Sequence, residues 1–279
     1  MKVFPFKIPK TSNDVLILQE DIEEVFYDKL HQHQEIQISY IVKGQGTLLV
    51  GDAVDRYNEG DVLVFGSNLP HVFKSDPIRD SYSHMRTVFF DINGFGEQLF
   101  KSEEFKELEG FFTLAQAGFK INRPTIKYSD SFNLLWEKEK LERTLLFFQI
   151  LNMLNKDEKT LLSSFGKNRQ YGANEGERMS RIFHHLMNNF KNDISLREIA
   201  EVSALSPTAF CRFFKQRTKK TFSQFLLELR IEHACRLLSK KDSQMPITAI
   251  AYDCGFNSIS NFNRYFKKIK GISPRNYTK

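Results

Sequence analysis

Hydrophobic and polar positions follow a different rhythm in each part of the chain. From about Val15 to Asp91, short alternating or wholly apolar runs are separated by turn residues such as KGQG and YNEG. Strands this short and evenly spaced are typical of an all-β barrel or sandwich. The clearest runs are IQISYIV at 36–42, TLLV at 47–50, DVLVF at 61–65 and MRTVFF at 85–90.

From Glu97 onward the apolar residues recur at helical intervals. A second helical stretch is predicted from about Ser131 to Leu162, with the charged run 137–140 on its solvated face. The apolar side of these helices must cover either the barrel or a partner chain. The two stripes consist of Leu99, Phe100, Phe105, Leu108, Phe111, Phe112 and Leu114, and of Leu134, Leu135, Leu141, Leu145, Phe148, Leu151, Met153 and Leu154.

The stretch SSFGKNRQYGANEGE at 163–177 has the composition of a linker. The amphipathic segment ERMSRIFHHLMNNF follows it and opens a helical region. The chain is therefore predicted to be an α+β protein of several domains. We expect a β-barrel at 1–95, a helical segment at 96–163, a linker at 164–177 and an all-α domain at 178–279.

Within the last domain one segment occurs twice. Residues 196–215 read LREIAEVSALSPTAFCRFFK and residues 247–267 read ITAIAYDCGFNSISNFNRYFK. Each copy is typical of a short helix, a tight turn and a second helix, the arrangement that lays a helix in the DNA major groove. A long helix from about Phe222 to Lys241 would separate the two copies.

Local capping patterns predict where these helices begin. Ser195 and Glu198 form a predicted capping box, and Ser206 followed by Pro207 is a helix start. Asn257 is predicted to cap the second helix of the second copy. Gly255 stands where the first copy has Ala204, in a turn that favours a left-handed backbone.

Helical geometry also predicts which side of each second helix is exposed. In the first copy, near 207–217, the phenylalanines at 210, 213 and 214 form the core side. In the second, near 258–269, Phe262, Tyr265 and Phe266 do so. The outer faces then carry Thr208, Cys211, Arg212 and Lys215, and Ser260, Asn263, Arg264 and Lys267. Asparagine can bond adenine and arginine guanine at two points, and lysine suits phosphate.

The distribution of charge along the chain favours nucleic acid as a binding partner. The net charge is +6, but residues 1–165 contain 19 basic and 25 acidic residues whereas residues 166–279 contain 21 and 9. Only the C-terminal part is therefore expected to meet a polyanion, and the basic run 215–220 is better explained by a DNA backbone than by a plain solvated face.

Composition excludes several other classes. The 279 residues are 41% hydrophobic and 27% charged, as in a globular protein of about two domains. No segment has the length of a signal peptide or a membrane span, so a cytoplasmic location is expected. The cysteines at 211, 235 and 254 form no Cys-x-x-Cys pair, which predicts reduced thiols rather than disulfides or a thiolate zinc site.

The second copy carries a pattern that resembles the DNA-binding domain of the AraC/XylS family of bacterial transcription regulators. The matching residues are Ile250, Ala251, Gly255, Phe256, Ser260, Phe262, the run 264–267, Gly271, Ser273, Pro274 and Tyr277. The resemblance implies two helices in successive major-groove faces. It implies that Thr208, Cys211 and Arg212 read one DNA segment and that Ser260, Asn261, Asn263 and Arg264 read the other. Because Asn263 and Arg264 are the side chains better suited to bases, we expect the second copy to matter at least as much for sequence choice.

The β-rich part resembles the cupin barrel in the motifs HQHQEIQISYIVKG and GDVLVFGSNLPHVF. Metal-binding cupins use three imidazoles and a carboxylate, which the resemblance would assign to His31, His33, Gln37 and His71. An amide is a poorer ligand for a divalent ion than a carboxylate, and Glu35 has the wrong spacing. We therefore predict no metal and no other cofactor. These five residues are instead the expected lining of an effector pocket in a barrel that binds a small molecule or nothing.

The leading hypothesis is a ligand-responsive transcription factor, not an enzyme, that binds promoter DNA as a homodimer. The resemblance implies pairing through the 96–163 helices, and contact with RNA polymerase if the protein is an activator, as most of the family are. One alternative is a cupin metalloenzyme with an accessory DNA-binding tail. Another is a constitutive DNA-binding protein whose barrel is purely structural.

Overall fold

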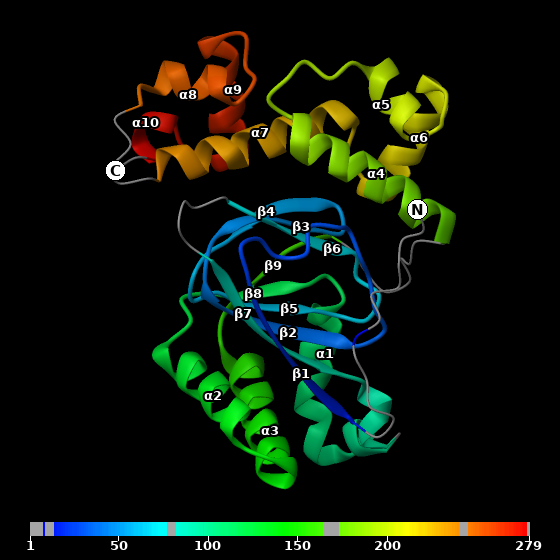
Figure 1. Ribbon diagram of the computed structural model, residues 1–279, viewed down its shortest axis with the longest axis vertical. Coiled ribbons are helices and arrows are strands. Elements are labelled where there is room, and N and C mark those ends of the chain that lie inside the picture. Colours follow the sequence, from blue (N-terminus) through cyan, green and yellow to red (C-terminus); the bar gives the residue numbers. More distant parts are fainter. Residues whose placement is uncertain are drawn as a thin grey trace. The chain divides into compact units, whose positions relative to one another are not determined.

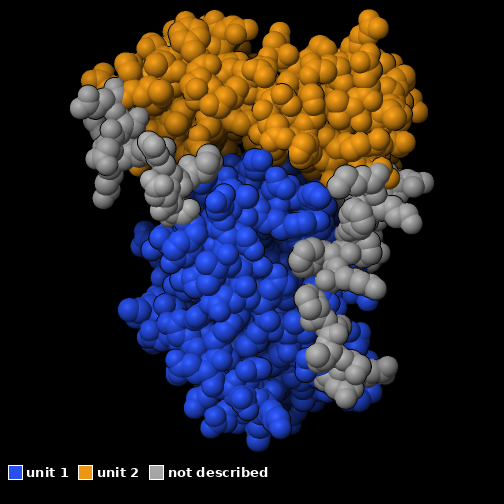
Figure 2. Space-filling model, in the orientation of Figure 1, with its two compact units in different colours: residues 1–173 blue, residues 174–279 orange. Residues whose placement is uncertain are grey.

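The computed structural model describes residue 8 and residues 14–76, 82–96, 98–164, 173–239 and 245–277. The chain divides into two compact units, residues 1–173 and 174–279 (Figure 2). Residues 165–172, which make up most of the predicted linker, lie outside the described part. Among the described helices, none combines the length and apolarity that a membrane crossing requires.

The strands of unit 1 form two antiparallel sheets (Figure 1). The larger has the order β1 (Leu16–Glu23), β7 (Ser83–Phe90), β2 (Ile36–Lys43), β5 (Val62–Phe65), β8 (Phe119–Ile121) and β9 (Lys159–Leu161). The smaller has the order β4 (Ala53–Tyr57), β3 (Gly46–Val50) and β6 (His71–Ser75). The four apolar runs predicted as strands form β2, β3, β5 and β7, which confirms the β-rich N-terminal part.

Alternate side chains of β2 face two different environments, one apolar and one polar. Ile36 and Ile38 are buried in the core between the larger sheet and the helices of unit 1. Gln37 and Ser39 point the other way, where Ser39 Oγ lies 2.9 Å from Thr87 Oγ1 of β7. Successive residues of a strand face opposite sides of the sheet, so the sheet has an apolar outer face and a polar inner face.

The helices of unit 1 cover that outer face (Figure 1). Phe111, Phe132 and Phe147, each with no exposed surface, pack with the strands in one core. Part of the predicted apolar stripe therefore covers the barrel. The elements are η1 (Ile92–Phe95), η2 (Leu99–Lys101), η3 (Glu103–Leu108), α1 (Glu109–Ala115), α2 (Ile126–Glu137) and α3 (Lys140–Lys156).

The structure differs in two respects from the helical stretch predicted from about Ser131 to Leu162. Lys138 and Glu139 have extended backbones that separate α2 from α3, and the segment ends in strand β9, which pairs with β8. Three leucines of the predicted stripe are not buried, because they lie on the side of α2 and α3 away from the core. Leu134, Leu141 and Leu145 are 43%, 69% and 55% exposed.

Unit 2 is entirely helical in its described residues. Its helices are α4 (Ala173–Asn189), α5 (Leu196–Val202), α6 (Pro207–Thr218), α7 (Phe222–Leu238), α8 (Ile247–Asp253), α9 (Ile259–Lys270) and α10 (Pro274–Tyr277). The long helix α7 belongs to two cores. Phe225 contacts the rings of Phe183 and Phe214, whereas Ile231 and Ala234 pack with α8 and α9.

Capping differs from the prediction at two helices. Ser195 Oγ accepts from Glu198 N at 3.1 Å, but the Glu198 carboxylate is hydrogen-bonded to His185 Nε2 instead of returning to Ser195. The reciprocal capping box lies at the start of α7, between Thr221 and Gln224. A side-chain partner elsewhere in the fold has therefore replaced a local bond that the sequence pattern alone favoured.

Candidate DNA-binding surface and effector pocket

The first candidate recognition helix, α6, is bounded by local signals. Ser206 Oγ accepts from Ala209 N at 3.3 Å, and Pro207 occupies the first turn. The helix ends at Lys219, whose φ of 57° is left-handed. These caps place α6 where the sequence predicts it.

The second, α9, begins at Ser258 rather than at the predicted cap Asn257. Ser258 Oγ lies 3.5 Å from Asn261 N and accepts its hydrogen, whereas Asn257 is exposed. Gly271, with a φ of 76°, ends the helix. Both serine and asparagine make good N-caps, so the sequence could not decide between neighbours.

The turns before α6 and α9 share one backbone conformation. Ala204 has a φ of 52° and Gly255 a φ of 81°. At Gly255 a Cβ would lie 2.5 Å from Lys191 O, so a larger residue would also clash there. The two copies of the repeat therefore differ in tolerance: alanine fits the first turn, and only glycine fits the second.

The inner faces of both helices pack as predicted, except that Phe213 and Tyr265 are only partly buried. Phe210 and Phe214 of α6 and Phe262 and Phe266 of α9 are fully buried. Phe213, predicted to belong to the core side, is only partly buried. The guanidinium groups that flank its ring, from Arg178 and Arg217, lie 5.6 and 6.0 Å from the ring centroid.

The structure places all nine predicted DNA-contacting residues on exposed positions of α6 and α9. They are Thr208, Cys211, Arg212 and Lys215 on α6, and Ser260, Asn261, Asn263, Arg264 and Lys267 on α9. Arg264 is held in place on this surface: its Nη2 donates to Asn261 Oδ1 at 3.0 Å, and its Cζ lies 4.8 Å from the Tyr265 ring centroid.

The basic residues around these helices fall into two groups. Arg217, Lys220 and Lys270 are paired with Glu175, Glu228 and Glu232. Within the described part of the chain, the outer-face cations of α6 and α9 have no carboxylate within 4.0 Å; these are Arg212, Lys215, Arg264 and Lys267. Since ion pairing within the protein offsets a charge, the second group is the one available to phosphates.

In unit 1 the two cupin-like motifs meet at a buried cluster. His31 and His71 form an isolated β-bridge, and His33 lies beside them. The nearest ring nitrogens of the three lie within 4.8 Å of one another. The Gln37 amide Oε1 is 2.9 Å from the Nε2 atoms of both His33 and His71. The residues that were predicted to line a pocket are thus brought together, apart from Glu35.

The three rings share one hydrogen-bonding arrangement. The Nδ1 atoms of His31, His33 and His71 lie 2.8–2.9 Å from the carbonyl oxygens of Lys29, Glu35 and Leu69. Carbonyls only accept, so each Nδ1 carries a hydrogen. Burial lowers the pKa of all three, that of His31 to about 4. The rings are therefore neutral near pH 7, and each Nε2 is a lone pair.

The tautomer of the histidines determines which end of the Gln37 amide faces them. If the amide oxygen faced the rings, the Nε2 lone pairs of His33 and His71 would receive no hydrogen bond. If the amide NH2 group faces the rings, it donates one hydrogen to each of them. The amide's nitrogen and oxygen exchange places by a half-turn. With NH2 toward His33 and His71, the amide oxygen accepts from Ser39, whose Oγ lies 2.9 Å from the other end of the amide. The Nε2 atoms of His33 and His71 and both ends of the Gln37 amide then have suitable partners.

The cluster does not fit a divalent ion. Two of the three Nε2 lone pairs are taken by the Gln37 amide, and no carboxylate completes the set. Glu35 does not supply one, because its Oε2 lies 4.0 Å from His33 Nδ1, on the side of the ring away from the cluster. The amide occupies the position that an ion would need.

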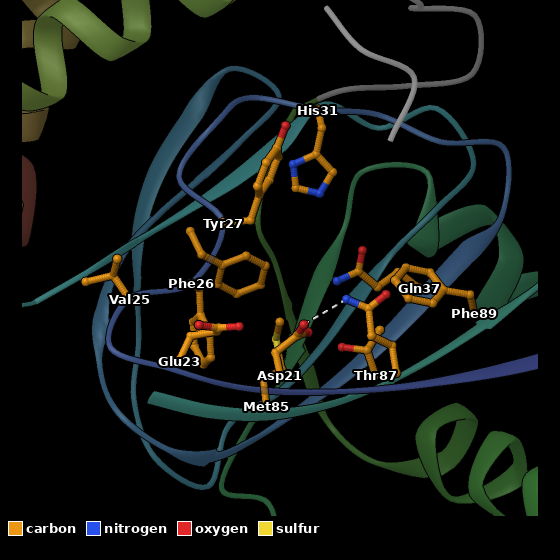
Figure 3. A pocket seen from close by; sticks show the side chains of 12 residues that line it. Asp21, Glu23, Val25, Phe26, Tyr27, His31, Gln37, Met85, Thr87 and Phe89 are labelled. Atoms are coloured by element: carbon orange, nitrogen blue, oxygen red, sulfur yellow. Dashed lines mark hydrogen bonds between the residues drawn. The ribbon is translucent and has the colours of Figure 1, made fainter. Parts of the chain in front are cut away.

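Beside the cluster lies a cavity of about 330 Å³ (Figure 3). Of the predicted residues, His31 and Gln37 line it, while His33, Glu35 and His71 do not. The other lining residues were not predicted from the sequence; they are Gln19, Asp21, Glu23, Val25, Phe26, Tyr27, Phe73, Met85, Thr87 and Phe89. One pattern was available: Gln19, Asp21 and Glu23 alternate along β1 and so share a face.

Comparison with known proteins supports both domains. Residues 199–279 match the family model of a helix-turn-helix domain, and residues 22–76 match that of a cupin domain. The chain is 34% identical over 159 residues to the HTH-type transcriptional activator RhaS of Mannheimia succiniciproducens, covering 56% of each protein. It is 24% identical to the uncharacterized HTH-type transcriptional regulator YdeC of Bacillus subtilis, over 91% of this chain and 87% of that protein.

Among solved structures, the C-terminal domain of AraT, a response regulator from Geobacillus stearothermophilus, is 30% identical with a TM-score of 0.34. That match covers 36% of this chain and 83% of that one. The chain thus spans little more than half the length of the first relative, and most of the second. The domain matches confirm the two resemblances predicted from the sequence motifs.

Proposed function

We propose, from the premise that the chain belongs to the AraC/XylS family, that it is a transcription regulator that binds promoter DNA sequence-specifically and responds to a small molecule. It acts on DNA through α6 and α9 and is not an enzyme. The observation that carries this proposal is the pair of equivalent helices whose outer faces keep unpaired cations and amides exposed.

The two helices enter successive major-groove faces, about 34 Å apart along the DNA. Arg264 and Asn263 supply the side chains best suited to bases, because a guanidinium matches guanine and an amide matches adenine. On α6, Arg212 and Thr208 contact bases, Cys211 contributes little hydrogen bonding, and Lys215 meets phosphate. Base recognition in the second half of the site is therefore the stronger.

The cupin domain is the sensor in this proposal, and a ligand in its cavity changes how the two helix-turn-helix segments are positioned for DNA binding. The working form is a cytoplasmic homodimer. Exposed leucines support pairing through α2 and α3, since Leu141 and Leu145 lie one turn apart on α3 and Leu134 lies on α2. As an activator, which most of the family are, the dimer would also contact RNA polymerase.

Footprinting tests the assignment. The wild-type chain selects its binding site from random duplex DNA, and protection of that site is then measured for Arg264→Ala. Loss of a bidentate base contact costs about 1–3 kcal/mol, so the affinity measured from protection across a protein titration should fall by about 5- to 150-fold. Lys101→Ala, which removes an exposed cation from unit 1, is the matched control and should protect as the wild type does. Unchanged protection by Arg264→Ala refutes the assignment.

A further inference from the structure

One wall of the cavity of unit 1 carries hydrogen-bond acceptors. Asp21 and Glu23 contribute carboxylates from β1 (Figure 3). His31 carries its hydrogen on Nδ1, which is turned to the Lys29 carbonyl, so its Nε2 is an acceptor. Among the described residues that line the cavity there is no lysine or arginine.

One acceptor of this wall lacks a donor. Gln19 Nε2 donates to Asp21 Oδ1 at 2.8 Å, which fixes the orientation of the Gln19 amide. Its Oε1 is buried and has no hydrogen-bond partner within the described residues. A buried polar atom without a partner is costly, so a ligand that donates a hydrogen bond to it would be stabilised here. A hydrogen-bond donor is what this wall lacks.

The remaining walls are aromatic. Phe26, Tyr27, Phe73 and Phe89 line the cavity, and Phe26 packs edge-on against Phe73 with 6.0 Å between ring centroids. The face of an aromatic ring attracts a cation. At about 330 Å³ the cavity is at the small end of the range for small-molecule pockets.

We propose that this cavity binds a small organic ammonium ion, with the charged group between Asp21 and Glu23 and the organic part against the aromatic rings. The inference rests on the proposed function in one respect only, namely that this ligand is the effector; the binding itself does not depend on DNA. Each NH3⁺ group brings three donors to a wall of acceptors. A carboxylate or phosphate ligand would meet two like charges and no counter-ion.

Burial supports the same charge preference. It raises the pKa of the Asp21 carboxyl group, and the neighbouring Glu23 charge adds to the increase. A bound cation relieves both effects, because it is an opposite charge in a partly desolvated place.

Calorimetry on the full chain tests the proposal with three probes of similar size: phenethylammonium, 2-phenylethanol and phenylacetate, at matched ionic strength. We expect phenethylammonium to bind at least tenfold more tightly than the alcohol, and phenylacetate to bind most weakly. In Asp21→Asn/Glu23→Gln the preference for the ammonium over the alcohol should disappear. That variant keeps an acceptor for Gln19 Nε2, and its melting temperature checks that it folds.

Glu24→Gln is the control, since it removes an exposed charge next to β1 that does not line the cavity; it should bind phenethylammonium as the wild type does. No binding of phenethylammonium, equal or tighter binding of either other probe, or an unchanged preference in the double variant overturns the proposal. Operator footprinting separates the two levels. Cation binding without DNA protection refutes the regulator function alone, and DNA protection without a cation preference refutes the ligand class alone.

Discussion

Replacing Gln37 by glutamate should turn the histidine cluster from a closed hydrogen-bond network into a metal site. In the wild type the Gln37 NH2 group donates to the Nε2 atoms of His33 and His71, which lie 2.9 Å from the amide. A carboxylate has no hydrogen to give. In Gln37→Glu both lone pairs therefore face an anion, and the three imidazoles with the carboxylate form a four-ligand set for a divalent ion.

The size of both effects follows from that geometry. Each buried acceptor that loses its donor costs about 1–3 kcal/mol, so the metal-free variant should be less stable by about 2–6 kcal/mol above pH 7. Metal at a hundred times its dissociation constant restores about 2.7 kcal/mol. For a unit of this size, 1 kcal/mol corresponds to roughly 2–4 °C in melting temperature, so Ni²⁺ should raise that of the variant by about 5–10 °C.

The single tryptophan makes the assay specific for unit 1. Trp136 lies in α2, with Arg86 of β7 5.3 Å from its ring, so its fluorescence follows unfolding of this unit. Thermal scans with and without Ni²⁺ are compared for wild type, Gln37→Glu and Gln37→Leu. The leucine variant loses the same donor without gaining a carboxylate, so it should be destabilised but respond to metal less than Gln37→Glu does. If Ni²⁺ raised the melting temperatures of the wild type and of Gln37→Glu equally, the conclusion that the Gln37 NH2 group occupies the two lone pairs would be refuted.

Three further predictions concern stability. Ala204→Gly should stabilise unit 2 by about 0.5–1 kcal/mol because it removes an alanine from a left-handed backbone conformation. Gly255→Ala should destabilise unit 2 by more than that, because the added Cβ would clash with Lys191 O. Urea unfolding followed by circular dichroism measures both changes, and the same sign for the two would contradict the shared turn geometry. Thr221→Ala, which removes the capping box of α7, should cost about 1 kcal/mol in the same assay, and no change would show that the box contributes nothing. Burial holds the pKa of His31 at about 4 in the folded protein, against 6.5 in the unfolded chain, so the unfolded chain takes up the proton first as the pH falls. The contribution of neutral His31 to the free energy of unfolding is therefore complete above pH 6.5, and about 3 kcal/mol of it is lost by pH 4. Urea unfolding followed by Trp136 fluorescence should show that the stability of His31→Phe depends less on pH than that of the wild type.

Local signals explain why the helices of unit 2 could be predicted almost to the residue. The expected ranges near 207–217 and 258–269 correspond to Pro207–Thr218 and Ile259–Lys270. A capping serine, a proline and a left-handed C-terminal residue lie within the segment they delimit. The break between α2 and α3 had no such signal, because the charged run 137–140 contains no glycine or proline.

The cluster of unit 1 could be predicted only in part, for a similar reason. His31 and His33 stand in one motif and His71 in the other, and an isolated β-bridge between His31 and His71 joins the two motifs. The cavity depends on more distant relations. On β1 the polar residues Gln19 and Asp21 face inward while Leu16 and Leu18 pack against the helices, the reverse of the usual rule that apolar residues face the barrel interior. Only the arrangement of the helices outside the sheet accounts for that reversal.

The pairing of β8 with β9 has a consequence for how unit 1 is made on the ribosome. β9 starts at Lys159, more than eighty residues after the cupin match ends at residue 76, and it completes the sheet beside β8. A nascent chain that stops after β7 leaves β5 as an open edge, with the apolar outer face of the sheet uncovered. Such edges recruit other strands. The minimal cupin segment, expressed alone, should therefore aggregate, and its soluble expression should begin only when the chain extends past Leu161.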